Sequence, residues 1–242
     1  MAESHTGPRR RGESATTPPL PGRGAAAIAA AVLMAVVGCS VTEPSGPRAA
    51  TLPPDDVRAT NLVFLANRRP VLAPGSECVA FTSRLHTVAG VPQDVRATTM
   101  VPGHGCWAGD DHGTVVSVMT TATPFGEFWR RDYPDDDGSG ITATILDKDA
   151  AQLFERFVLG NRYYAVRVGS RWPAGLDSGT TKTACMLVVD TGAAQPLLIN
   201  LTQQVPTIDP VARTVAQQCD TAASVARTVL DQQDPGGGSR VS

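Results

Sequence analysis

The chain has 242 residues, a formal net charge of −2 at pH 7, and 5% aromatic residues. A weakly acidic chain of this kind offers no electrostatic footprint for nucleic acid and no basic patch for anionic lipid headgroups. The length suits one domain with flanking segments, and the scarcity of aromatic residues predicts a core built mainly from Val, Leu, Ile and Ala.

Residues 1–38 are predicted to form a lipoprotein signal peptide. Arg9, Arg10, Arg11 and Arg23 provide a basic start, and an almost wholly apolar stretch follows at residues 24–37. As a helix this stretch reaches only about 21 Å, which is short for a bilayer core of about 30 Å. The arginine triplet leaves both export routes open, general secretory and twin-arginine.

The apolar stretch ends in Val36-Val37-Gly38-Cys39, which resembles the lipobox of bacterial lipoproteins. In that motif a diacylglyceryl group is joined to the cysteine thiol, and a peptidase cuts after the small residue before it. Two acyl chains, such as palmitate, anchor a protein firmly, whereas one binds only marginally. We therefore expect a protein lipid-anchored through Cys39 to the extracytoplasmic face of the cell membrane. An ordinary secretory signal and an uncleaved membrane anchor are the alternatives.

The mature chain divides into three parts by composition. Residues 39–59 contain the lipidated cysteine and a disordered linker rich in Pro, Ser and Thr. Residues 60–231 form the extracytoplasmic domain, and the Gly-rich residues 232–242 are expected to be a disordered tail.

Within the domain, hydrophobic periodicity and turn residues predict an α+β fold with a mostly antiparallel sheet and packed helices, including a long C-terminal helix. Asp190-Thr191-Gly192 is expected to start a hairpin turn into a strand at 196–201. Helices are expected at 76–89, 147–159 and 210–230. Other strands are expected at 94–101, 114–123, 162–169 and, apolar on both faces, 184–189.

With Cys39 lipidated, an even number of cysteines remains: Cys78, Cys106, Cys185 and Cys219. In an oxidising compartment this favours two disulfides, and four cysteines allow three connectivities. We prefer Cys78–Cys106 and Cys185–Cys219, because each pair is close in sequence and ties a helix face to a strand. No C-x-x-C spacing supports a redox or metal site.

Two clusters could bind a metal ion. The first has His and Asp ligands suited to zinc or copper, at His104, Asp110, Asp111 and His112. A Gly-rich hairpin loop with exposed polar residues explains the same pattern, and we favour it. The acidic residues that start at Asp132 do not fit an EF-hand loop, so a solvated turn is the better interpretation. We expect no metal and no cofactor.

No catalytic motif is found either. The chain lacks a G-x-S-x-G elbow and an S-x-x-K triplet of the penicillin-binding type. His86 is expected to be a solvated residue on the polar side of its helix. Trp129 and Trp172 flank loops, where they could line a ligand groove or close the edge of the core. We therefore expect no catalytic residues.

The order of these motifs resembles the actinobacterial lipoproteins of domain-of-unknown-function family 3558. An Arg-rich, Ala- and Gly-rich composition, typical of high-GC genomes, agrees with that source. The resemblance implies an extracytoplasmic domain with two disulfides, similar in outline to sensor domains of some mycobacterial kinases, and it implies no activity. The pieces that carry it are Val36-Val37-Gly38-Cys39, Cys78-Val79-Ala80-Phe81-Thr82, Gly105-Cys106-Trp107, Cys185-Met186-Leu187-Val188-Val189 and Cys219-Asp220-Thr221-Ala222.

The sequence thus favours a non-enzymatic ligand-binding or accessory lipoprotein of the cell envelope, with an unknown envelope ligand or protein as its partner. Such a protein predicts an apolar groove without a paired acid and base. A hydrolase-like envelope enzyme is the first alternative, and it predicts that His104, His112 or the acidic residues converge in a cleft. A structural partner of another envelope protein is the second, and it predicts an exposed apolar patch.

Overall fold

The computed structural model describes residues 54–94, 96–99, 105–110, 113–133, 151–173, 179–207 and 214–242. The chain divides into two compact units, residues 1–42 and 43–242, and all described residues belong to the second. The predicted signal peptide and Cys39 lie outside the described residues. None of the described helices is long and apolar enough to cross a bilayer.

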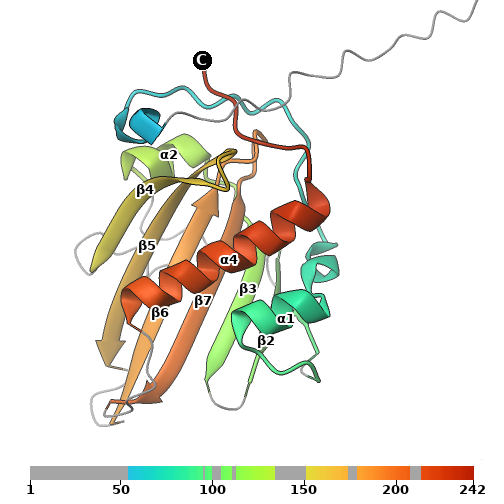
Figure 1. The fold of residues 1–242 in the computed structure, drawn as a ribbon, viewed down its shortest axis with the longest axis vertical. Coiled ribbons are helices and arrows are strands. Elements are labelled where there is room, and N and C mark those ends of the chain that lie inside the picture. The colour runs from blue at the N-terminus through green and yellow to red at the C-terminus, as the bar shows by residue number, and fades with distance from the viewer. Residues whose placement is uncertain are drawn as a thin grey trace, which may run out of the picture. The chain divides into compact units, whose positions relative to one another are not determined.

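The domain is built on one seven-stranded sheet with the order β1-β2-β3-β7-β6-β5-β4, shown in Figure 1. All neighbouring strands are antiparallel, so the expected mostly antiparallel sheet is confirmed. The strands are β1 (Thr98–Thr99), β2 (Gly105–Gly109), β3 (Thr114–Thr120), β4 (Leu153–Leu159), β5 (Tyr163–Pro173), β6 (Thr180–Val189) and β7 (Leu197–Pro206).

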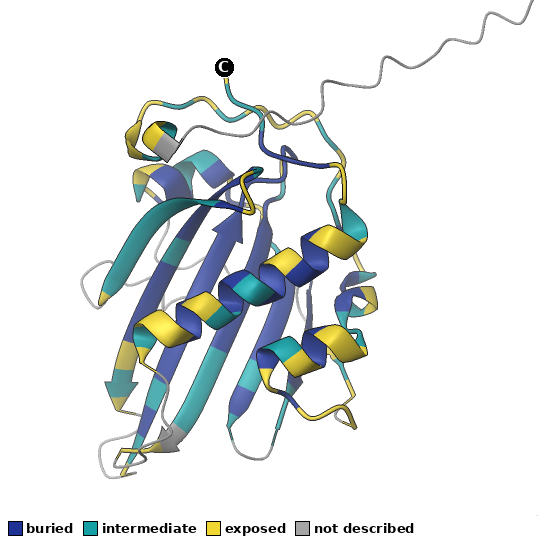
Figure 2. Cartoon of the chain, viewed as in Figure 1, coloured by how far each residue is buried: buried dark blue, intermediate teal, exposed yellow. Residues whose placement is uncertain are grey.

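The long C-terminal helix α4 (Val215–Gln233) crosses one face of the sheet diagonally, with α1 (Ser83–Ala89) beside it (Figure 1). Thr214 caps α4, because its side chain accepts the Gln217 N–H while the Gln217 side chain accepts the Thr214 N–H. Figure 2 shows that α4 turns its buried residues to the sheet and its exposed residues outward. The shorter helices are η1 (Pro54–Arg58), η2 (Glu77–Ala80) and α2 (Phe125–Arg130).

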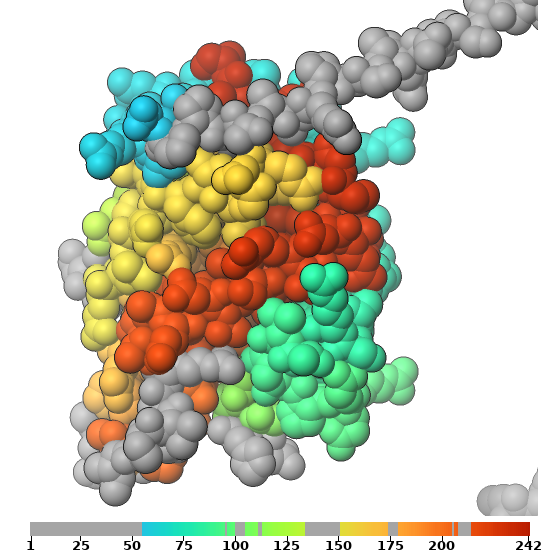
Figure 3. Space-filling view, viewed as in Figure 1, coloured from blue at the N-terminus to red at the C-terminus, as the bar shows by residue number. Residues whose placement is uncertain are grey.

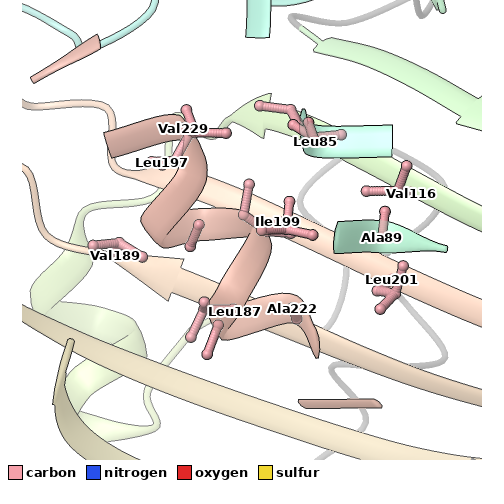
Figure 4. Close-up of a cluster of buried hydrophobic side chains, with 14 of the residues drawn as sticks. Leu85, Ala89, Val116, Leu187, Val189, Leu197, Ile199, Leu201, Ala222 and Val229 are labelled. Carbon is pink, nitrogen blue, oxygen red and sulfur yellow. The ribbon is translucent and has the colours of Figure 1, made fainter. Parts of the chain in front are cut away.

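Small and aliphatic side chains fill the space between α4 and the sheet (Figure 4). The close approach of α4 to β5 requires glycine at position 169, since a Cβ there would lie 2.4 Å from Val215 Cγ1 on α4. Cys185 on β6 is bonded to Cys219 on α4, and Cys78 on η2 is bonded to Cys106 on β2. The preferred pairing of the cysteines is therefore the one in the structure. Figure 4 labels Leu85, Ala89, Val116, Leu187, Val189, Leu197, Ile199, Leu201, Ala222 and Val229.

The opposite face of the sheet carries a second, more aromatic core. Phe64 is in edge contact with the rings of Phe125, Trp129 and Tyr164, with centroids 4.7, 5.5 and 5.6 Å away. Trp129 is fully buried and its Nε1 donates to Ala59 O at 2.7 Å. It therefore closes the edge of this core, which was one of the two roles considered for it.

One predicted helix is wrong. Residues 153–159 of the expected 147–159 helix form strand β4, paired with β5 throughout. The apolar residues of this segment satisfy a helical face as well as a strand, and pairing with the neighbouring strand decides between them. Gly160 and Asn161 have φ of 58° and 56° and make the β4–β5 turn.

Smaller differences occur elsewhere. The expected 76–89 helix is two helices, η2 and α1, because Thr82 caps α1 by accepting the Leu85 N–H. Of the expected 94–101 strand, residues 94 and 96–99 are described, and among them Thr98 and Thr99 form β1. His86 was expected to be solvated, but it is buried, with Nδ1 2.9 Å from Pro92 O.

Candidate functional site

The two ends of the described chain meet at one end of the sheet. Phe64 bridges to Val241 in antiparallel fashion, Leu65 N donates to Arg240 O, and Ser242 N donates to Val63 O. In Figures 1 and 3 the first residues of the domain, in blue and cyan, lie beside the red C-terminal residues. We expected residues 232–242 to be a disordered tail, but residues 232–233 end α4 and the rest pack onto the domain.

Ser239 attaches this C-terminal segment to the sheet. Its side chain is only 3% exposed. Its Oγ donates to Asp190 O at 2.7 Å and accepts the Tyr164 N–H at 2.8 Å. One serine hydroxyl thus satisfies backbone groups next to β6 and on β5, which the composition of the segment did not predict.

Arg68 makes a second attachment. Its guanidinium holds Asp234 with two hydrogen bonds, Nη2 to Oδ1 at 2.6 Å and Nη1 to Oδ2 at 2.9 Å. Nη1 also donates to Thr191 O and Gly238 O, at 3.1 and 3.3 Å. The hydrogen bond to Asp234 is the main cause that raises the pKa of Arg68. Arg68 therefore joins the N-terminal segment, the β6–β7 loop and the C-terminal segment.

Asp190, directly after β6, is the unusual member of this region. It is 1% exposed, and its Oδ1 accepts the Gly192 N–H at 2.9 Å. Its Oδ2 is fully buried, and hydrogen bonds with the Gly192 N–H and the Ser239 side chain act to lower the pKa of the carboxyl group. Burial raises the pKa of Asp190 to about 6, although the charge of Arg68 acts in the opposite direction.

A pocket of about 430 Å³ lies beside these residues. Its walls are the segment 61–66, the start of α2 and the β6–β7 loop, and they are mainly apolar. The polar residues among those that line the pocket are Asn61, Arg130 and Asp190, and Asp190 is almost completely buried. A largely apolar hollow with a few polar groups is the usual form of a small-molecule site.

Two further hollows of about 440 and 320 Å³ lie between α4 and the β4–β5 hairpin, and both include Arg227. Other charged residues that line them already pair with each other. Arg162 pairs with Asp231 at 3.3 Å, and Arg167 pairs with Asp220 at 2.7 Å. These hollows are therefore lined by paired charges, whereas the pocket beside Asp190 has a mainly apolar lining.

The predicted site residues do not gather at this pocket. Cys78, Cys106, Cys185 and Cys219 form the disulfides. Asp110 Oδ1 accepts the Thr114 N–H at 2.7 Å in the β2–β3 turn, as expected for a hairpin loop. Among the described residues there is no group of three or more metal-ligating side chains. His104, Asp111, His112 and residues 134–138 lie outside the described residues.

The pocket residues were not selected from the sequence, because their local pattern predicts only a turn and no binding motif. Asp190-Thr191-Gly192 after an apolar run predicts a turn, and the structure confirms the β6–β7 hairpin. The apolar run Leu62-Val63-Phe64-Leu65, which follows η1, is the sequence signal that could have indicated that the N-terminal segment packs.

The comparisons with known proteins add no relative: no protein-family model matches the chain, and no curated protein matches it. The resemblance to domain-of-unknown-function family 3558 therefore stays a prediction.

Proposed function

We propose that this protein is a lipid-anchored binding protein of the cell envelope, and that the pocket between residues 61–66, α2 and the β6–β7 loop is its ligand site. The observation that carries the proposal is the pocket itself. Its volume of about 430 Å³ lies within the range usual for small-molecule sites. Its walls come from three segments far apart in the sequence, as in a site formed by the fold.

The pocket walls are held in place. Segment 61–66 is paired with the C-terminal segment, and the rings of Phe64 and Phe125 are in edge contact at 4.7 Å. A wall that is ordered before the ligand arrives reduces the entropy that binding must overcome. This supports a site for a ligand over a chance hollow between loops.

Binding accounts for the lining residues better than hydrolysis does. The described lining residues supply one carboxylate, Asp190, and one guanidinium, Arg130. Acyl transfer uses a nucleophile beside a general base, and neither Asp190 nor Arg130 forms such a pair with another lining residue. A few oriented polar groups in an apolar wall serve recognition.

The location outside the cytoplasm is supported by the signal sequence and by the two disulfides, which are typical of oxidising compartments. Replacing Cys39 with Ala should release the protein from membranes of the expressing bacterium, whereas Ser40→Ala should leave it attached. Fractionation and intact-mass analysis measure this. Firm attachment of the Cys39→Ala variant, or a native mass without lipid, would contradict the anchor.

The pocket is tested by a fragment screen on the full-length protein, purified in detergent and followed by ligand-observed NMR. Ala194 is exposed and lines the pocket, so Ala194→Trp should fill the hollow with little change to the core. We expect hits that bind the native protein and lose binding to Ala194→Trp. Ala216→Trp, on the exposed side of α4, is the matched control and should bind the hits normally. Hits insensitive to Ala194→Trp, or no hits, would overturn the proposal.

A further inference from the structure

We infer that the pocket takes an apolar molecule that carries one carboxylate, and that the Arg130 guanidinium is the group that binds this carboxylate. This inference rests on the proposed function, because it names the ligand class of the same pocket. Three observations carry it: an accessible guanidinium without a carboxylate partner, apolar side chains exposed along the pocket wall, and a buried acid that offers a ligand no contact.

The first observation is the position of Arg130, the last residue of α2. It is exposed and lines the pocket. Its Nη1 lies against Gly126, near the start of the same helix, since a Cβ on Gly126 would be 3.1 Å from this nitrogen. Gly126 lines the pocket as well. The guanidinium therefore lies along the pocket wall, where a ligand can reach it.

Arg130 also differs from the paired arginines of the domain. Arg68, Arg162 and Arg167 each form an ion pair with an Asp or Glu side chain. Among the described residues, by contrast, the Arg130 side chain has neither an ion pair nor a hydrogen bond. A guanidinium presents its N–H donors as a planar fork that binds a carboxylate with two parallel hydrogen bonds. One such group in the pocket favours a ligand with one carboxylate.

The second observation is the apolar wall of the pocket. Val63 and Leu65 line it and are 57% and 36% exposed, which is unusual for large aliphatic side chains of the domain. Leu62 and Phe64 line it too and are half-buried. Covering such surface with a hydrocarbon or aromatic body removes it from water, which favours binding. The ligand is therefore expected to be mainly apolar, with its carboxylate at Arg130.

The third observation is that the acid beside the pocket does not offer a binding group. Asp190 is the single acidic residue among the described lining residues. It is 1% exposed, its Oδ1 accepts the Gly192 N–H at 2.9 Å, and its Oδ2 is fully buried. A ligand cation thus finds no reachable carboxylate in the pocket, whereas a ligand anion finds the Arg130 guanidinium.

The test uses three probes of nearly equal shape, phenylacetate, phenethyl alcohol and phenethylamine, with acetate as the isolated anionic group. They are titrated into full-length protein in a non-ionic detergent at pH about 7.5, and ligand-observed NMR gives the dissociation constants. Phenylacetate should bind at least about fivefold more tightly than phenethyl alcohol, because its hydrogen bonds are charge-assisted. Phenethylamine should bind more weakly than either, because its ammonium group would face Arg130. Acetate should bind at least about tenfold more weakly than phenylacetate, because it lacks the apolar body.

Arg130→Met keeps an unbranched apolar side chain and removes the charge. It should weaken phenylacetate binding by about fivefold or more and change phenethyl alcohol binding by less than about twofold. Arg84→Met, at an exposed position on α1 that does not line the pocket, is the matched control and should change neither. The comparison of the probes on native protein tests the inference even if Arg130→Met does not fold.

The outcomes separate the two proposals. Equal binding of phenylacetate and phenethyl alcohol, equal binding of phenylacetate and acetate, no effect of Arg130→Met, or no binding of any probe would overturn the assignment of an apolar carboxylate. If the fragment screen still yields hits that Ala194→Trp abolishes, the pocket remains the ligand site with a different ligand class. If the screen yields no such hits, the proposed function is overturned as well.

Discussion

Helix α4 and the C-terminal segment that follows it are held to the domain by different kinds of contact. Along its length, α4 packs on the sheet through small apolar side chains such as Ala222 and Val229. The Cys185–Cys219 disulfide joins the helix to the sheet. Beyond its end, the C-terminal segment is held by polar contacts of Ser239 and Asp234. The first region is held mainly by apolar packing, with the Arg167–Asp220 ion pair at its surface, whereas the second is held by charges and hydrogen bonds next to a pocket.

This difference separates the scaffold from the site. A packed apolar core has little to offer a ligand, because its groups are already satisfied by one another. The end of the sheet has a hollow beside the buried Asp190, and the Arg68 and Ser239 contacts hold the segments around it in place. Substitutions should therefore affect stability most under α4, and binding most at the end of the sheet.

The largest effect is expected from removing the disulfide under α4. In the chain-entropy model, a crosslink that spans 34 residues stabilises by about 4 kcal/mol. Cys185→Ala with Cys219→Ala should lower the free energy of unfolding by about this amount in urea. The Cys78→Ala, Cys106→Ala pair should cost less, because Cys78 is partly exposed whereas both Cys185 and Cys219 are fully buried. The reverse order would contradict the role given to the core under α4.

Arg68→Ala should have the next largest effect. It removes a two-bond, partly buried ion pair with Asp234 and the contacts to two carbonyls. We expect a loss of about 2–3 kcal/mol in urea unfolding, together with weaker ligand binding, since the pocket wall loses its attachment. Arg69→Ala, at the exposed neighbouring position, should change stability by less than about 0.5 kcal/mol. Equal effects of the two substitutions would show that the attachment is unimportant.

Asp190 should make stability depend on pH in an uncommon direction. Its pKa in the fold is about 6, above the ordinary value of 3.8, so the folded state binds a proton more readily than the unfolded state. This group therefore contributes stability as the pH falls from about 7 toward 4, by about 2–3 kcal/mol at most. Urea unfolding of native protein and Asp190→Asn across this range isolates the contribution. An identical pH dependence of the two proteins would contradict it.

Ser239→Ala should have the smallest effect. The substitution leaves Asp190 O without its side-chain donor and Tyr164 N without its acceptor, which should cost about 1–2 kcal/mol. Hydrogen exchange at Leu65 N, which donates to Arg240 O, should accelerate as the segment loosens. Ser242 is exposed and its backbone N donates to Val63 O, so Ser242→Ala should leave both the free energy of unfolding and the exchange rate of Leu65 N unchanged.

Local pattern predicted much of the fold. Alternation and apolar runs located β3, β5, β6 and β7, and apolar periodicity located α4, because in these elements the buried face is encoded in the segment itself. Residues 153–159 fit a helix and a strand equally, and only their partner β5 decides. The cysteine pairing followed from compartment and spacing.

The site could not be predicted in the same way. Residues 234–242 have the composition of a disordered tail. They are ordered by contacts with Arg68 and Val63, which lie near the N-terminal end of the domain in the sequence. Asp190 was predicted to be a turn residue, which it is, but its burial depends on these distant segments. No local signal in the sequence reports a contact between the two ends of a domain.

The most direct test of the binding site is to map the bound ligand by NMR. In ¹H–¹⁵N spectra of labelled protein titrated with a hit from the fragment screen, we predict the largest shifts at the amides of Phe64, Gly126 and Gly192, around the pocket. Ala222, under α4, should not move. Shifts centred on Gly160 and Arg227, or no saturable shifts, would contradict the assignment of the site to this end of the sheet.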